Sequence, residues 1–409
     1  MDSERKTALA LLSAAAVRER ANEMLAEGES GDLANFRVEL GKLVPTADFV
    51  ANVVRESYPD LKVPLHARWR HFVFHGRDLW AEIAAKAAWH DGAARARAEF
   101  DLAIVSVLLD AGAGPDWRYR DAATGMTIGR SEGLALASLR MFAAGLFSAD
   151  ARDPLRVDAK RLAALTAADL TLGFAAAGDN HLTGLEGRAD LLARLGRTML
   201  NGETIFARHD SARPGGLFDH LTTGTKTLAA PVILHELLLH LGAIWPNRLT
   251  LAGLSLGDTW RHPAIKRADA SNGLMPLHKL SQWLSYSLIE PLQRAGIAVT
   301  DIDGLTGLAE YRNGGLFLDA GVIALREPNA ATQPQAVNSA LVVEWRALTV
   351  ALLDRMLPLV RERLGVPQHA FPLGALLEGG TWAAGRKLAE QTRADGSPPL
   401  TVVSDGTVF

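Results

Sequence analysis

The sequence predicts a mainly α-helical protein with at most a few short strands. Three observations support this fold class: leucine and alanine recur at three- and four-residue spacing, good helix formers fill these stretches, and alternating strand-like runs are few. Of the 409 residues, 48% are hydrophobic, which provides enough apolar area for a core and excludes disorder for most of the chain. We expect one predominantly helical domain over residues 1–409, and an arrangement of two lobes with the site between them remains open.

The helical pattern recurs along the whole chain. Helices are expected at 4–27, 77–111, 131–146, 157–176, 181–200, 226–242, 276–295 and 339–365. The breaks between them contain the proline and glycine residues that end helices, for example at 112–115 and 257–263. Two alternating runs, 317–325 and 400–403, predict short strands.

Composition excludes several function classes. The net charge of −3 and the sequence pI near 6.5 argue against broad electrostatic binding to nucleic acid or to an anionic membrane. Cysteine is absent, which excludes disulfides, thiolate metal sites, iron–sulfur clusters and cysteine nucleophiles. The start of the chain does not have the pattern of a signal peptide, and no long apolar window could span a bilayer. We therefore expect a soluble, cytoplasmic protein.

One apparent metal motif does not have the right spacing. His235 and Glu236, followed by His240, look like a zinc-protease helix, but the histidines are five residues apart instead of four. At about 100° per residue, this places the two rings on different faces of a helix. The sequence favours an amphipathic helix with polar edges. Glycine-rich phosphate loops and serine nucleophile elbows are also absent from the sequence. No metal and no organic cofactor is expected.

Polar and aromatic residues gather at glycine-rich junctions in the first third of the chain. Two arginines flank a tryptophan just before a predicted helix, and this group suits either anion binding or a structural cation–π cluster. An aspartate ends an apolar helix, and an aromatic pair that could stack on a ring-shaped ligand follows it through a loop. The candidate binding residues here are Arg68, Arg70, Asp110, Trp117, Tyr119, Arg130 and Glu132.

A denser polar constellation lies in the last third of the chain. Lys279 and Gln282 are one helical turn apart at the start of a predicted helix. The run 301–315 then carries several acids and a helical turn that is expected to end in a glycine junction. The alternative for this turn is a glutamate–arginine ion pair on the surface. The candidates in this run are Asp301, Asp303, Glu310, Tyr311, Arg312 and Asn313.

Together, these motifs resemble the fungal and bacterial uracil-catabolism protein four family. The resemblance spans essentially residues 1–409 and rests on the motifs RWRHF, LLDAGAGPDWRY, RSEGLALASL, MPLHKLSQWLSYSLIEPL, GLAEYRNGGLFLDAGV, EGGTWAAGR and SDGTVF. The family belongs to a ring-opening pyrimidine pathway. The resemblance therefore implies action on ribosylurea or its 5-phosphate.

A weaker similarity to the queuosine-salvage nucleoside glycosidases implies a chemistry. Those proteins have a helical architecture like that of helical DNA glycosylases, and they carry a Lys-Arg-Ala-Gln run and a DIDxLTxFADYR run. Lys279 and Gln282 match the first run, with Leu280 in place of arginine. The stretch from Asp301 to Arg312 is similar to the second run, with Glu310 in place of the family's aspartate. The longer glutamate keeps the charge and extends its reach.

The two resemblances imply an N-glycosidase that releases urea from ribosylurea. An oxocarbenium-like transition state requires a carboxylate beside the anomeric carbon, and Glu310, Asp301 and Asp303 are the candidates. We also expect Asp110, Trp117, Lys279, Gln282 and Glu310 to line one pocket. An amidase acting on the urea carbonyl and a non-catalytic scaffold protein of the pathway are the alternatives. The expected partner is a small ribosyl substrate, and the oligomeric state is open.

Overall fold

A computed structural model describes residues 3–114, 116–201, 204–207, 211–246 and 248–403. Helices dominate in this part of the chain, and its strands are two or three residues long and form only two-stranded sheets. The prediction of a mainly helical fold is therefore confirmed. No helix among the described residues is long and apolar enough to cross a membrane. The C-terminal motif SDGTVF, residues 404–409, lies outside the described residues.

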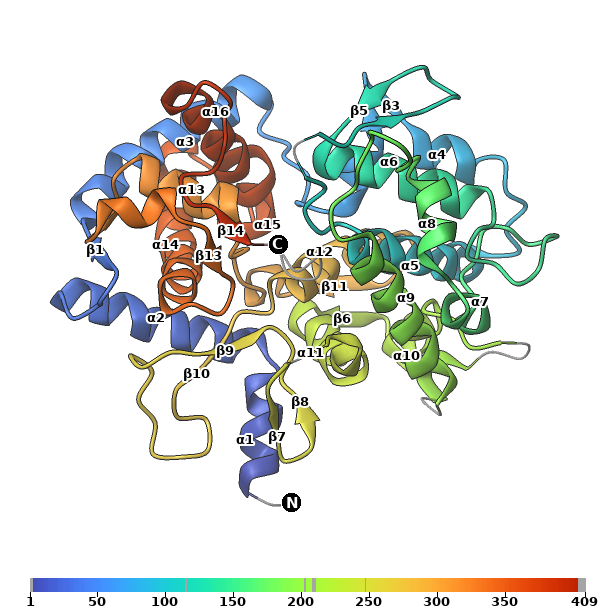
Figure 1. Cartoon of the computed structure of the whole chain (residues 1–409), viewed down its shortest axis with the longest axis horizontal. Coiled ribbons are helices and arrows are strands. Elements are labelled where there is room, and N and C mark those ends of the chain that lie inside the picture. Colours follow the sequence, from blue (N-terminus) through green and yellow to red (C-terminus); the bar gives the residue numbers. More distant parts are fainter. Residues whose placement is uncertain (1–2, 115, 202–203, 208–210, 247, 404–409) are drawn as a thin grey trace. The chain divides into compact units, whose positions relative to one another are not determined.

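The chain forms two compact units, here called unit 1 and unit 2 (Figure 1). Among the described residues, unit 1 comprises 3–66, 248–282 and 301–403, and unit 2 comprises the described part of 67–246 together with 283–300. The chain passes from unit 1 to unit 2 within helix α12 (Lys279–Arg294), after Gln282. The candidate site residues are therefore divided between two separately packed cores.

Unit 1 is built around α14, a helix of 25 residues whose buried side chains pack against α2, α3 and α13. Its helices are α1 (Ser3–Leu11), α2 (Ala14–Ser30), α3 (Leu43–Ser57), α13 (Tyr311–Asp319), α14 (Ala340–Leu364), α15 (Leu373–Ala375), the π-helix Leu376–Thr381 and α16 (Trp382–Thr392). Its strand pairs are β1 (Phe36–Val38) with β12 (Ile323–Leu325), β7 (Thr250–Leu251) with β8 (Leu254–Ser255), β9 (Thr259–Arg261) with β10 (Leu274–Pro276), and β13 (Gln335–Ala336) with β14 (Val402–Val403). The last pair is parallel and the others are antiparallel.

Unit 2 packs its helices around the buried α5, which contacts α6, α9 and α10. Its helices are α4 (Leu79–Ala84), α5 (Gly92–Leu108), α6 (Arg130–Ala143), α7 (Ala159–Ala163), α8 (Ala167–Gly173), α9 (Leu185–Leu200), α10 (Gly216–Thr222), α11 (Ala230–Leu241) and the second part of α12. Its strand pairs are β2 (Val73–Phe74) with β3 (Arg77–Asp78), β4 (Tyr119–Arg120) with β5 (Thr127–Ile128), and the parallel pair β6 (Thr227–Ala229) with β11 (Ala298–Thr300).

Several predicted helices are interrupted by helix-capping residues. The stretch 4–27 contains α1 and α2, because the Ser13 hydroxyl accepts a hydrogen bond from the Ala16 N–H at 3.2 Å and starts a new helix. The stretch 77–111 contains α4 and α5, with Asp91 capping α5. The prediction of a strand over 317–325 is wrong in its first part, since Phe317 lies in α13, while 323–325 form β12.

The predicted glycine junction after Glu310 is also wrong. Gly314 and Gly315 lie inside α13 instead of ending it. The helix packs so closely against its neighbours that larger side chains would not fit at these positions. A Cβ atom on Gly314 would lie 2.7 Å from the Trp345 ring of α14, and one on Gly385 of α16 would collide with the backbone oxygen of Arg312. Glycines on two elements therefore allow α13 to pack between α14 and α16.

Replacing Gly385 with alanine tests this close packing. Alanine has the higher helix propensity, yet the added methyl group meets backbone that cannot move aside, so we expect the variant to be destabilised by about 1–3 kcal/mol. Gly41→Ala is the control, because no atom lies within 4 Å of the added Cβ. Thermal or denaturant unfolding of both variants measures the difference. Equal stability of the two variants would contradict the packing of α16 on α13.

Candidate functional site

Glu310 caps the N-terminus of α13 and is almost completely buried. Its backbone is extended, and its carboxylate accepts hydrogen bonds from two backbone N–H groups, from Asn313 at 2.5 Å and from Arg312 at 2.7 Å. Only 8% of the residue is exposed. The first N–H groups of a helix have no partner within the helix, so a carboxylate at this position satisfies them. The alternative of a surface ion pair with Arg312 does not describe this buried arrangement.

Opposing effects act on the charge of Glu310. Burial raises the pKa of this carboxyl above the ordinary glutamate value. The two backbone N–H groups, and then the charges of Lys279 and His66, act in the lowering direction. Lys279 and Glu310, which are 31 residues apart in the sequence, therefore interact within unit 1.

A buried ion pair fixes the start of α12, where Lys279 lies. The Lys279 backbone N–H donates to Asp258 at 3.0 Å, and both oxygens of Asp258 accept from the Arg346 guanidinium at 2.9 and 2.6 Å. Burial alone would raise the pKa of Asp258, but the Arg346 charge and the hydrogen bonds lower it to about 2. Arg346 also donates to the Ala309 carbonyl at 3.3 Å, directly before Glu310. One guanidinium thus positions the backbone at both Lys279 and Glu310.

Two buried amides nearby have unused hydrogen-bonding atoms. Gln282 is 0% exposed, and its Oε1 accepts from the Thr306 N–H at 3.3 Å. Asn313 is 1% exposed, and its Nδ2 donates to the Leu308 carbonyl at 3.2 Å. Among the described residues, Gln282 Nε2 and Asn313 Oδ1 have no hydrogen-bond partner. These two amides therefore offer a buried donor and a buried acceptor to a ligand.

A histidine–glutamate pair that the sequence did not identify also belongs to unit 1. His66 Nδ1 lies 2.6 Å from Glu378 Oε2, and the His66 ring lies 6.2 Å from the Trp382 ring. Glu378 lies in the π-helix Leu376–Thr381, a geometry that often occurs at functional sites. The EGGTW motif, which includes Glu378, was a sequence signal for this position.

The other two predicted catalytic acids have different surroundings. Asp303 accepts hydrogen bonds from the Arg361 guanidinium at 2.7 Å, from Gln368 Nε2 at 3.1 Å and from the Leu373 N–H at 2.7 Å. These contacts tie the turn that contains Asp303 to α14 and α15. Asp301 is exposed and has a positive φ of 50°. Catalytic roles for these two acids stay predictions, and Glu310 is the buried acid of the three.

Tyr311 and Arg312 form the first turn of α13. The Arg312 guanidinium lies 5.1 Å from the centre of the Tyr311 ring, and its Nη1 donates to the Gly396 carbonyl at 3.0 Å. Arg312 is 5% exposed, so it anchors the segment before β14 to α13.

A second polar cluster, in unit 2, surrounds the fully buried Arg68. Arg68 Nε donates to the Ser106 hydroxyl at 2.6 Å, and Nη1 donates to Asp110 at 2.7 Å. Asp110 also accepts from the Ser131 hydroxyl at 2.7 Å. Burial lowers the pKa of Arg68, while the charges of Asp110 and Glu132 raise it. Among the described residues, Arg68 Nη2 has no hydrogen-bond partner, so this nitrogen could donate to a ligand.

Most of the remaining predicted residues of unit 2 already have protein partners, which makes them less available to a ligand. Arg70 forms an ion pair with Glu290 at 2.7 Å, and Arg130 is exposed. Trp117 is 0% exposed, and its Nε1 donates to the Phe174 carbonyl at 3.1 Å. Tyr119 stacks on Trp117 with ring centres 6.5 Å apart, and burial raises its pKa. These contacts give Trp117 a packing role, and its stacking on a ligand stays a prediction.

The five residues expected to line one pocket are divided between the two units. Lys279, Gln282 and Glu310 belong to unit 1, whereas Asp110 and Trp117 belong to unit 2. A single pocket for all five residues stays a prediction.

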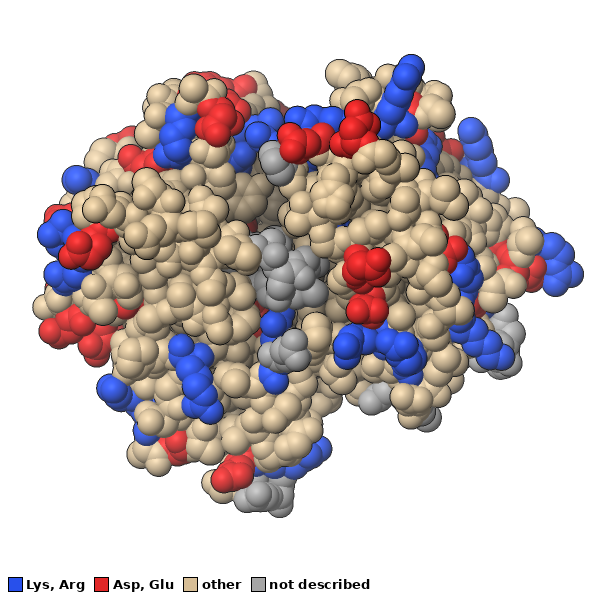
Figure 2. All heavy atoms as spheres, in the orientation of Figure 1, with Lys and Arg blue, Asp and Glu red and all other residues tan. Residues whose placement is uncertain are grey.

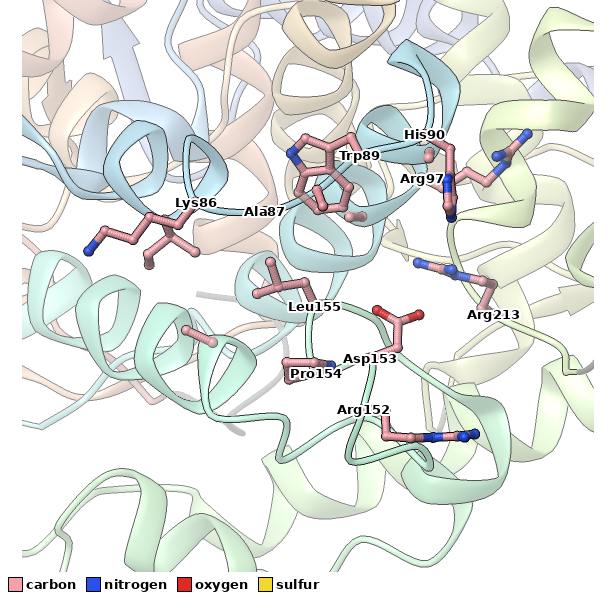
Figure 3. A pocket seen from close by; sticks show the side chains of 15 residues that line it. Lys86, Ala87, Trp89, His90, Arg97, Arg152, Asp153, Pro154, Leu155 and Arg213 are labelled. Atoms are coloured by element: carbon pink, nitrogen blue, oxygen red, sulfur yellow. The ribbon is translucent and has the colours of Figure 1, made fainter.

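A cavity of about 810 Å³ in unit 2 lies elsewhere (Figure 3). None of the predicted site residues lines it. Basic side chains surround it, but Arg97 and Arg213 already form ion pairs with Asp219 and Asp101. On the face shown in Figure 2, acidic and basic side chains are interspersed.

The buried pair of Arg68 and Asp110 predicts a large effect of Asp110→Asn on stability. Removing one charge leaves the Arg68 guanidinium buried without its counter-ion, which costs roughly 3 kcal/mol. Asp150→Asn is the matched control, because its Arg152 partner is 91% exposed and the same substitution should leave the unfolding transition close to that of the wild type. Equal transitions for the two variants in denaturant unfolding would argue against the buried pair.

The raised pKa of Glu310 predicts a specific pH dependence of stability. The folded protein holds this proton more tightly than the unfolded chain, so Glu310 stabilises less as pH rises from the ordinary value of 4.5 through the raised pKa. The melting temperature of Glu310→Gln should therefore rise relative to the wild type across this window. Scanning calorimetry at several pH values measures it. Parallel curves, or the opposite slope, would mean that the pKa of Glu310 is not raised.

Comparison with known proteins identifies the family. A family model described as a protein of unknown function (DUF1688) matches residues 10–409. Protein urg3 of Schizosaccharomyces pombe is 38% identical over 420 residues, covering 99% of this chain and 99% of that protein. Uracil catabolism protein 4 of Lachancea kluyveri is 36% identical over 434 residues, covering 97% of this chain and 98% of that protein. The chain therefore belongs to the DUF1688 family, and its resemblance to the uracil-catabolism protein four family is confirmed.

Proposed function

We propose that the protein acts in uracil degradation, by hydrolysing the N-glycosidic bond of ribosylurea or of its 5-phosphate. The similarity to uracil catabolism protein 4 over nearly the whole chain supports the role in uracil degradation. The observation that carries the reaction type is Glu310, a buried carboxylate at a helix N-terminus that interacts with a lysine and a histidine. The products would be urea and ribose or ribose 5-phosphate.

Cleavage of this bond builds positive charge on the sugar. The transition state resembles an oxocarbenium ion, and a fixed negative charge beside the anomeric carbon stabilises it. The two backbone N–H groups hold the Glu310 carboxylate in one orientation, so little reorganisation is needed during the reaction. Each carboxylate oxygen has a further lone pair that can face the substrate. Glu310 would thus stabilise the sugar cation, orient the attacking water and take its proton.

The departing urea nitrogen needs a proton donor. His66 is the candidate, because histidine is a common general acid and Glu378 Oε2, 2.6 Å from His66 Nδ1, orients its ring. The charge of Lys279 would favour the ionised form of Glu310, which stabilisation of the sugar cation requires. His66 and Glu378 join the residues inferred from the sequence as site residues.

The unused hydrogen-bonding groups of the two buried amides are complementary to those of a urea group. Urea has N–H donors and a carbonyl acceptor, while Gln282 offers an unused N–H group and Asn313 an unused oxygen. A substrate with a 5-phosphate would need a cation, and Lys279, Arg68, Arg70 and Arg130 stay the predicted candidates. Arg70 is the weaker candidate because Glu290 already neutralises it.

An amidase acting on the urea carbonyl is the second candidate function, and Ser131 would be its nucleophile. The Ser131 hydroxyl lies 3.2 Å from His71 Nδ1, a contact that a serine nucleophile and its base could make. However, Asp110 accepts from Ser131 itself with both oxygens, whereas in catalytic triads the carboxylate orients the histidine. Because Asp110 contacts the serine instead of the histidine, this arrangement is not that of a catalytic triad, and it favours the glycosidase over the amidase.

Incubation of the purified chain with ribosylurea, and separately with its 5-phosphate, distinguishes the candidates. Free urea plus ribose or ribose 5-phosphate supports the glycosidase. Ammonia and carbon dioxide would support the amidase, and the absence of any product would leave a scaffold protein of the pathway. The two substrates, compared by kcat/KM, also decide whether the phosphate is recognised.

Glu310→Gln tests the role of the carboxylate. The substitution keeps the size and can keep one hydrogen bond to the helix, but it removes the charge. Turnover should therefore fall by about 10²-fold or more, while KM changes far less because the ground-state sugar carries no positive charge at the anomeric carbon.

The matched control is Asp91→Asn, which also removes a charge from a helix N-cap and should leave turnover unchanged. Unchanged turnover of a folded Glu310→Gln protein would exclude Glu310 and shift attention to Asp110, Asp301 and Asp303.

A further inference from the structure

Two helices of unit 2 bring together a group of metal-ligating side chains outside the proposed active site. His220 lies on α10, and Glu236 and His240 lie on α11. One ligand atom from each of the three residues lies within 4.8 Å of the others. We call these three residues the α10–α11 cluster.

Both histidines of the α10–α11 cluster contact the same oxygen of Glu236. Glu236 Oε2 lies 2.7 Å from His220 Nε2 and 3.1 Å from His240 Nε2. The two imidazole rings are 5.5 Å apart, with an angle of 78° between their planes. Both rings therefore direct the same kind of nitrogen towards a single carboxylate oxygen. An ion among these three atoms could replace both hydrogen bonds.

The fold, and not the local spacing, creates this arrangement. Glu236 and His240 are four residues apart on α11, so they share one face, and α10 contributes His220 from outside that helix. The sequence motif instead suggested His235 and His240, which are five residues apart. The motif on α11 does not predict the cluster, because the third ligand, His220, comes from α10.

We propose that the α10–α11 cluster binds a divalent transition-metal ion of the zinc type. Imidazole nitrogens together with one carboxylate are typical ligands for zinc and related ions, whereas calcium and magnesium prefer oxygen ligands alone. Three protein ligands leave at least one position for water. The exposed fractions of the side chains, 36% for His220, 19% for Glu236 and 16% for His240, leave a route from solvent to the ion.

Binding would require a rearrangement of protons but no redox step. In the metal-free cluster, the histidine Nε2–H groups donate to Glu236. In the bound form, each neutral imidazole carries its proton on Nδ1, so that the Nε2 lone pair faces the ion. The ion would then link α10 to α11 across residues 223–229.

Metal titration of the full-length chain tests this proposal. The protein is first treated with a chelator and then titrated with zinc chloride by calorimetry and with cobalt chloride by visible absorption. We expect one ion per chain and the absorption of cobalt with nitrogen and oxygen ligands. Because the chain has no cysteine, thiolate bands cannot interfere.

Variants identify the ligands. His220→Ala, Glu236→Gln and His240→Ala should each weaken zinc binding strongly. Loss of a group that only hydrogen-bonds to a metal ligand costs about 10–100-fold in affinity, and loss of a ligand itself should cost more. His369→Ala, which removes an exposed histidine of unit 1, is the matched control and should bind like the wild type. Zinc should raise the melting temperature of the wild type and of this control only.

Two outcomes would overturn the proposal. One is the absence of saturable binding in the wild type, and the other is equal binding by the cluster variants and the His369→Ala control. The readouts are affinity, absorption and melting temperature, so the result does not depend on the glycosidase proposal. Circular dichroism of each variant verifies that it is folded.

Discussion

The buried guanidinium of Arg346 is the interaction on which the candidate site in unit 1 depends. It binds both oxygens of Asp258, which in turn accepts from the Lys279 backbone, and it donates to the Ala309 carbonyl beside Glu310. Arg346 is 1% exposed, and a charge at that depth is tolerated only when it is paired and hydrogen-bonded. Because α14 carries this guanidinium, the core helix of unit 1 also determines the relative positions of the lysine and the carboxylate.

The same core imposes the environment of Glu310. Glycines at the contacts allow α13 to lie close to α14 and α16, and this packing buries the helix N-terminus that Glu310 caps. Burial favours the protonated acid, while the helix N–H groups and nearby cations favour the carboxylate. The packing of unit 1 thus determines both the orientation of the Glu310 carboxyl group and the direction of its pKa shift.

The sequence predicts the helical class and most long helices, since their periodicity is a local property. It does not predict α13, because a Gly-Gly pair usually ends a helix and only contact with Trp345 explains it here. The motif resemblance implies Glu310, Asp301 and Asp303 alike, and burial distinguishes Glu310 from the other two. The contacts of Asp303 with Arg361, and of His66 with Glu378, join residues 58 and 312 positions apart, so no local pattern could reveal them. No local pattern could reveal the contact of His220 with Glu236 of α11 either, because the two residues lie on different helices.

Attack of water at the anomeric carbon, next to Glu310, is the central claim for the function. The most direct measurement is a single turnover of ribosylurea in heavy-oxygen water, followed at once by reduction of the sugar and mass analysis of both products. Cleavage of the glycosidic bond places the heavy oxygen on C1 of ribose and leaves urea unlabelled. Heavy oxygen in carbon dioxide or carbamate, with ribosylamine in place of ribose and no free urea, would mean that water attacks the urea carbonyl and would contradict the claim.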